Sequence, residues 1–152
     1  FINALLSNKP EKLDFYKFSD NTASTADNET MLRYKTHFGE PVETKSMNTV
    51  TLERILVEYD VSNDFELLCI DVEGVDLKVL ESFDINIYRP KVILIEMKLF
   101  NFTSVSASKI FNYLNENNYS MIAKTPLDGF FVDRHQDLGW IPKELLSNNI
   151  IY

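Results

Sequence analysis

The chain has 152 residues, of which 45% are hydrophobic, and a domain of about this size buries roughly 68–70% of the surface that its unfolded chain exposes. Its 23 acidic residues outnumber 15 lysines and arginines, and the net charge of −8 argues against nucleic acid as the main partner, because phosphate binding needs a basic surface. Nothing resembles a signal peptide, and no apolar run approaches the roughly 20 residues of a membrane span. We therefore expect one cytoplasmic domain over residues 1–152, with no membrane partner.

The first part of the chain predicts strands separated by a long polar segment. Leu13–Phe18 has the alternation and aromatic content of a strand. Phe1–Leu6 could be another strand, and a short strand is expected at Val42–Ser46. The segment Ser19–Gly39 is poor in aliphatic residues and rich in Asp, Asn, Ser and Thr. We predict a long loop there, with at most a short helix. Such a loop could border a substrate entrance or be a plain insertion.

A helix is predicted after Thr51, which has the side chain of an N-cap residue. Leu52, Ile55, Leu56 and Tyr59 then follow at helical spacing. This apolar stripe predicts a face that packs in the core.

The run Leu67–Ile70 is apolar without alternation, which is typical of a strand covered on both faces of a parallel sheet. The only cysteine, Cys69, excludes an internal disulfide and is expected to be buried in this strand. Asp71 and Glu73 follow the strand, where ligands of open α/β sheets bind. A helix N-terminus with acidic residues placed for the dipole explains the same residues equally well.

A helix and a second strand follow. Asp76 falls in the first turn of the helix, and its apolar face is formed by Val75, Val79, Leu80 and Phe83. Pro90 then separates this helix from the apolar run Val92–Ile95. A strand, a helix and a strand in this order predict a right-handed parallel crossover.

The last third predicts a helix and an antiparallel hairpin. The helix is expected to start near Ser104–Ser106 and to end at Asn117–Asn118, and the hairpin to pair Tyr119–Ala123 with Phe130–Val132. One more helical turn is expected after Pro142. The fold class is therefore α/β, with parallel central strands, flanking helices and a C-terminal antiparallel hairpin.

The central segment resembles the FkbM-type methyltransferase family, whose members use S-adenosylmethionine. The family pattern consists, in chain order, of an apolar strand, the motif Asp-Val-Glu-Gly, a helix with Val-Leu near its end, a proline, and a second strand that ends in Glu. Thr51–Leu56 and Ala4–Ser7 also resemble the family's preceding helix start and an earlier strand end, and agreement is weaker beyond Asn118. About three quarters of the chain is covered. The residues in matching places are Asp71, Val72, Glu73, Gly74, Val79, Leu80, Pro90 and Glu96.

The resemblance implies a partial Rossmann-like class I methyltransferase sheet and S-adenosylmethionine as cofactor, with Asn3, Ala4 and Asp71 at the cofactor. It also implies O-methylation of a hydroxyl on a sugar, glycan or secondary metabolite. One feature departs from the family: the four glycines are widely separated, so no glycine-rich turn is available for cofactor binding. Either the domain is N-terminally incomplete, as a start at Phe1 without methionine favours, or the cofactor site is lost.

Three carboxylates are the candidate catalytic residues. Asp71, Glu73 and Glu96 are expected at the carboxyl ends of neighbouring strands, where they would raise one another's pKa values and allow one to act as a general base. We favour Asp71 or Glu73 as base or substrate anchor, with Glu96 third. The same oxygens could hold a divalent metal, which we do not favour.

Other chemistries have less support. Zinc is disfavoured because His37 and His135 are expected in separate loops. The aromatic residues Phe100 and Phe102, which follow Glu96, could line an acceptor pocket. The alternative to an enzyme is a non-catalytic binding or scaffolding module, and an unpaired edge strand in a truncated sheet would favour self-association into a homo-oligomer.

Overall fold

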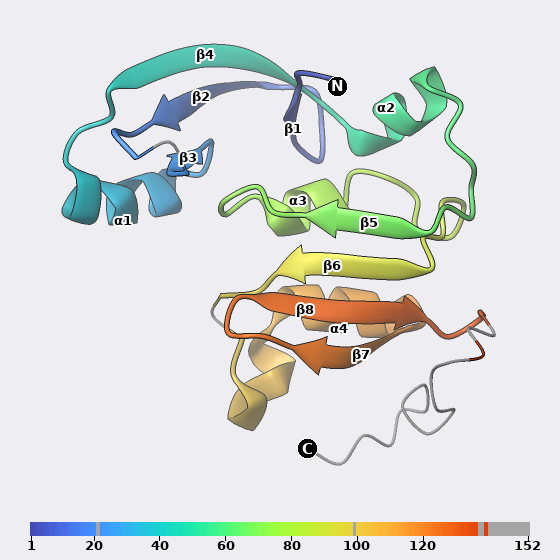
Figure 1. Cartoon of the computed structure of the whole chain (residues 1–152). Helices are drawn as coiled ribbons and strands as arrows, with labels where there is room; N and C mark the ends of the chain where they lie inside the picture. The colour runs from blue at the N-terminus through green and yellow to red at the C-terminus, as the bar shows by residue number, and fades with distance from the viewer. Residues whose placement is uncertain (21, 99, 137–138, 140–152) are drawn as a thin grey trace. The chain divides into compact units, whose positions relative to one another are not determined.

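A computed structural model gives the structure of residues 1–20, 22–98, 100–136 and 139, and Figure 1 shows its strands and helices. The chain divides into two compact units. One consists of Phe1–Asp60 with Asp71–Asp84, and the other of Val61–Ile70 with the described residues from Ile85 onward. Each unit has a four-stranded sheet. The fold is therefore mixed α/β with two sheets, while the single domain and the Rossmann-like sheet stay predictions.

The first unit has a mixed sheet with the strand order β1-β4-β2-β3. β4 runs antiparallel to β2 and parallel to β1, and β2 also pairs with β3. The expected first strand is much shorter than predicted and the third is longer. The strands are β1 (Leu5–Leu6), β2 (Lys12–Lys17), β3 (Ser24–Thr25) and β4 (Glu43–Val50).

The prediction of a long loop over Ser19–Gly39 is wrong, because this segment contains β3 and the eleven-residue helix α1 (Asn28–Phe38). The Asp27 side chain caps the helix by accepting a hydrogen bond from the Thr30 amide at 2.7 Å. Gly39, with φ of 78°, ends it. Capping residues at both ends thus define a helix that has few aliphatic residues.

Aromatic packing replaces the missing aliphatic residues of α1. The Tyr34 ring packs edge-on against Phe18 at 5.6 Å and against Phe38 at 5.7 Å between ring centroids. Phe18 is 1% exposed. His37, predicted in a loop, lies in this helix with its side chain exposed, whereas His135 follows the last strand.

Two further helices of this unit begin close to where the sequence predicts. Thr51 caps α2 (Leu52–Glu58) by accepting from the Arg54 amide at 3.2 Å. The predicted stripe on this helix is only partly core, because Leu56 is buried but Tyr59 is 54% exposed. The next helix is α3 (Asp76–Leu80), and its expected apolar face is confirmed, since Val75, Val79, Leu80 and Phe83 are all buried.

The second unit has a sheet with the strand order β5-β6-β8-β7. β5 and β6 are parallel neighbours, with Ile70 beside Ile95, as the sequence predicts. The predicted hairpin is also confirmed, since β7 and β8 are antiparallel. The strands are β5 (Leu67–Ile70), β6 (Val92–Glu96), β7 (Tyr119–Lys124) and β8 (Asp128–Asp133).

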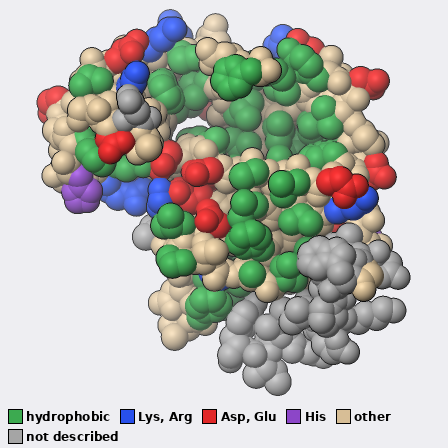
Figure 2. Space-filling view, viewed as in Figure 1, with side chains coloured by type: hydrophobic (Ala, Val, Ile, Leu, Met, Phe, Trp, Pro, Cys, Tyr) green, Lys and Arg blue, Asp and Glu red, His purple; other side chains and the backbone are tan. Residues whose placement is uncertain are grey.

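The expectation that β5 is covered on both faces is wrong. Ile70 is buried, but Leu67 is 56% exposed and Cys69 is exposed too. Side chains alternate along a strand, so Leu67 and Cys69 share one face and Ile70 lies on the other. Figure 2 shows hydrophobic side chains at the surface over β5 and β6. An apolar run predicts a strand here, but it does not show which of its faces is covered.

The predicted C-terminal helix is two helices in the structure. A 3₁₀ helix, η1 (Phe102–Ala107), precedes α4 (Lys109–Glu116), and Ser108 caps α4 by accepting from the Phe111 amide at 3.2 Å. The turn expected after Pro142 lies outside the described residues. No helix in the described parts of the chain is long and apolar enough to cross a bilayer.

A buried ion pair joins the second unit's sheet to the segment before β6. Arg89 donates to both carboxylate oxygens of Asp133, at 3.0 and 2.5 Å, and its guanidinium lies 5.0 Å from the centre of the Tyr119 ring. Asp133 is 0% exposed. Burial opposes the charged form of Asp133, but the hydrogen bonds from Arg89 and the His135 amide outweigh it and hold the pKa of Asp133 below its ordinary value.

Replacement of Arg89 by methionine leaves this carboxylate buried without its cation, so Arg89→Met should lower the free energy of unfolding by about 3–5 kcal/mol near pH 7. Because the pKa of Asp133 is lowered on folding, the stabilisation is complete above the ordinary carboxyl pKa of about 3.9 and is lost as the pH falls through the lowered value. We expect the difference in free energy of unfolding between the wild type and Arg89→Met to become smaller as the pH falls through this range. Urea unfolding at a series of pH values measures it.

The matched control is Arg54→Met, which removes an exposed ion pair with Glu58 at 3.9 Å. Its stability should stay close to that of the wild type at every pH. If Arg89→Met loses the same free energy of unfolding at every pH, the ion pair with Asp133 is not the source of the loss.

Candidate active site

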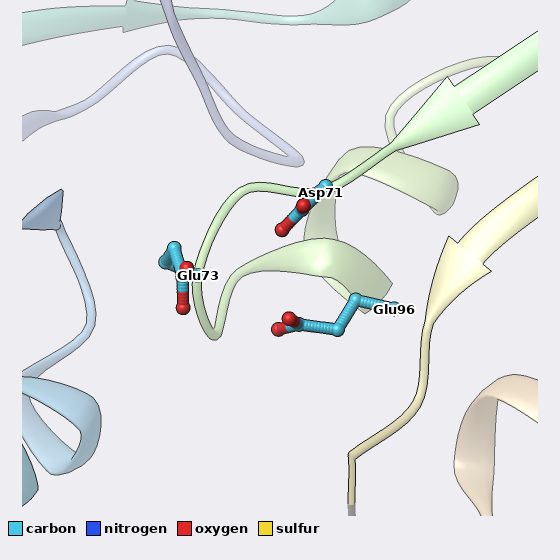
Figure 3. A group of neighbouring side chains, drawn as sticks. All are labelled: Asp71, Glu73 and Glu96. Atoms are coloured by element: carbon cyan, nitrogen blue, oxygen red, sulfur yellow. The ribbon is translucent and has the colours of Figure 1, made fainter. Parts of the chain in front are cut away.

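The acidic loop Asp71–Asp76 leaves β5 at its carboxyl end. Because Ile70 pairs with Ile95 in the parallel register, Asp71 follows the end of one strand and Glu96 is the last residue of its neighbour. Figure 3 shows Asp71 and Glu73 on this loop and Glu96 at the end of β6. The neighbouring parallel strands on which the predicted acidic edge depends are therefore present, and the grouping of the three carboxylates stays a prediction.

Glu73 has an unusual backbone conformation that the first unit holds in place. Its φ of 51° lies in the left-handed region, which is uncommon for a residue with a side chain. The Thr25 hydroxyl donates to the Glu73 carbonyl at 2.6 Å, and the Tyr34 hydroxyl donates to the Glu73 carboxylate. Neither donor was found from the sequence, because they are 48 and 39 residues away along the chain.

Gly74 is the one loop position where the structure requires glycine. Its φ is 104°, and a Cβ atom there would lie 2.3 Å from the Thr30 hydroxyl oxygen and 3.2 Å from the Asp27 Cβ atom. Thr30 is 2% exposed and its hydroxyl accepts from Arg33 at 2.9 Å, so it has little room to move. The loop backbone therefore packs directly against the start of α1.

Asp76 holds the loop from within. Its carboxylate accepts hydrogen bonds from the Val72 and Gly74 amides, each at 3.1 Å, and the residue is 6% exposed. Burial raises the pKa of Asp76 above its ordinary value, the amide hydrogen bonds oppose this, and the charge of Asp71 adds to it. The sequence indicates only a dipole role for Asp76, whereas the structure shows that it orders the turn.

The candidate carboxylates differ in exposure. Asp71 is exposed and Glu73 is half-buried. The Glu96 side chain is 10% exposed and forms an ion pair with Lys98 at 2.6 Å. Carboxylate oxygens suit a hard cation as well as proton transfer, so each of these side chains, taken by itself, offers a possible ligand or base.

The two other residues assigned to the cofactor, Asn3 and Ala4, line a pocket on the first unit's sheet. The pocket has a volume of about 260 Å³. The pairing of β2 with β4 brings lining residues from both strands together, because Phe15 on β2 lies opposite Lys45 on β4. Asp71 is not part of its lining, which consists of Asn3, Ala4, Leu5, Phe15, Lys17, Glu43, Lys45 and Met47.

The chain belongs to the methyltransferase FkbM domain family, whose model matches residues 2–121. This match confirms the resemblance predicted from the Asp71–Gly74 motif and Glu96, and it places the chain in a methyltransferase family. The match extends to the first residues of β7. No curated protein and no solved structure matches the chain significantly.

The Gly74→Ala variant tests the close contact between the loop and α1. Strain from the positive φ and overpacking against Thr30 should together lower the free energy of unfolding by about 2–5 kcal/mol. Gly39→Ala is the matched control, because Gly39 also has a positive φ but a Cβ atom there meets nothing within 4 Å. Its cost should be limited to about 1–3 kcal/mol of backbone strain. Urea unfolding of both variants measures this, and equal losses would contradict the close packing of Gly74.

Proposed function

We propose that this protein transfers a methyl group from S-adenosylmethionine to a hydroxyl of a sugar, glycan or secondary metabolite. One observation carries the proposal: the family's Asp-Val-Glu-Gly motif follows a strand whose parallel neighbour ends in Glu96. Open α/β sheets bind their ligands outside the carboxyl ends of such strands. The hydroxyl acceptor is the one that the family resemblance implies.

The bound cofactor would supply a methyl group on a positively charged sulfur. The protein must then orient the acceptor, and orientation contributes about 7–11 kcal/mol in reactions of this kind. It must also take the hydroxyl proton. Asp71 is our first candidate for this base because it is exposed at the end of β5. Glu73 is the second candidate for base or substrate anchor, and Glu96 the third.

The pocket around Asn3 and Ala4 fits one part of the cofactor. Its lining residues include Phe15 and Met47, and aromatic and thioether side chains suit the faces of a flat heterocycle. The carboxamide of Asn3 can donate and accept hydrogen bonds. No such support exists for the remainder of the cofactor, because the sequence lacks a cluster of glycines.

The alternative is a non-catalytic binding or scaffolding module. It is favoured by β5, which stands at the end of the strand order in its sheet and has Leu67 56% exposed. An edge strand of this kind presents backbone groups that another chain can pair with. A binding measurement with the cofactor product distinguishes the two functions.

The proposed activity predicts that S-adenosylhomocysteine binds with measurable heat and raises the thermal midpoint of the protein, because a ligand that binds only the folded state stabilises it. A panel of sugars, glycans and hydroxylated metabolites, scored by S-adenosylhomocysteine release, identifies the acceptor. Asp71→Asn should then lower kcat by about 100-fold or more, because it removes the first candidate for the base.

Asp14→Asn, an exposed acid on β2, is the control and should behave as the wild type. Unchanged turnover in Asp71→Asn would remove Asp71 from the role of base. Absence of both binding heat and thermal shift would contradict the enzyme and favour the binding module.

A further inference from the structure

We propose that Tyr34 is a positioning residue that holds the Glu73 carboxylate in its working orientation. This inference rests on the proposed function for its catalytic consequence, but its structural part stands on contacts within the first unit. The hydroxyl of Tyr34 donates to the Glu73 carboxylate. Tyr34 lies in α1, in a segment for which the sequence predicts a long loop with at most a short helix.

The Tyr34 ring is itself held in place, so that its hydroxyl is a fixed donor. The ring planes of Phe18 and Phe38 stand at 84° and 77° to the Tyr34 ring, on contacts below 6 Å between centroids. Edge-to-face packing of this kind favours one ring orientation. A donor fixed on a helix selects one orientation of the carboxylate from the several that a glutamate side chain can adopt.

The backbone of Glu73 is restrained independently. Thr25, which is 1% exposed, donates from its hydroxyl to the Glu73 carbonyl at 2.6 Å, and the same hydroxyl accepts from the Asp27 amide at 2.9 Å. The Thr25 hydroxyl is thereby oriented toward Glu73. Because Glu73 has a left-handed φ, which costs free energy for a residue with a side chain, these contacts help to explain why the conformation persists.

The two restraints act on different parts of one residue. Thr25 restrains the position of the Glu73 backbone, and Tyr34 restrains the position of the Glu73 carboxylate. A carboxylate that anchors a substrate or takes a proton must be held within about 0.5 Å of its productive position. The segment between β2 and β4 therefore supplies both side chains that restrain Glu73.

The test compares Tyr34→Phe with Tyr16→Phe. Tyr34→Phe keeps the ring packing and removes the donor to Glu73. Tyr16→Phe removes a hydroxyl that contacts Asn28 at 3.3 Å in the same unit, and should behave as the wild type. In Tyr34→Phe, kcat should fall by about tenfold, because hydrogen bonds to charged groups have roughly that effect. The KM for S-adenosylmethionine should change by less than about twofold, because a positioning residue acts on turnover.

A double-mutant cycle with Glu73→Gln separates positioning from a general structural effect. If Tyr34 acts through Glu73, Tyr34→Phe should have no further effect on kcat in the Glu73→Gln background. An equal loss in both backgrounds would overturn the proposal.

A second measurement does not depend on activity. The side-chain carboxyl ¹³C resonance of Glu73 should move in Tyr34→Phe, while those of the other glutamates stay in place. An unchanged Glu73 resonance would overturn the proposal whether or not the protein is active. If no acceptor is methylated, the proposed function fails, and a moved Glu73 resonance would still support the contact with Tyr34.

Discussion

The parallel hydrogen-bonded pairing of β5 with β6 is the constraint on which the candidate site depends. Since Ile70 lies beside Ile95, the residues that follow both strands leave the sheet at the same edge. Side chains alternate with a period of two along a strand, so a shift of one residue in this register would turn Ile70 and Ile95 to opposite faces. The burial of both isoleucines disfavours such a shift, and the hydrophobic core of the second unit thereby specifies the register of β5 on β6.

The acidic residues after β5 have different physical roles. Asp76 is buried and satisfies two backbone amides, so its charge is used to shape the turn. Glu73 has its carboxylate and its carbonyl held by hydroxyl groups from β3 and α1. Asp71 is exposed. The side chain that orders the loop backbone is therefore not the side chain that we propose to meet a substrate.

Local patterns predicted the parts of this fold that local physics determines. The apolar runs at β5 and β6, the Thr51 cap and the β7–β8 hairpin were found because periodicity and turn residues are visible in a single sequence. Helix α1 was missed because its stability comes from Asp27 and from Tyr34 packing on Phe18. Asp71 and Glu96 could be placed from strand ends, whereas the Tyr34 and Thr25 hydroxyls reach Glu73 through tertiary contacts that no spacing rule encodes. Cys69 was assigned wrongly for a related reason, since an apolar strand does not state which face is covered.

The exposure of Cys69 gives this molecule a single accessible thiol two positions before Asp71. A maleimide-linked fluorophore or spin label would attach at one defined place, on the face of β5 opposite to the buried Ile70. Such a probe would report the binding of a ligand near the loop without an assay for turnover. The unlabelled thiol also makes oxidation a practical concern during purification, because the exposed thiols of two molecules can form a disulfide.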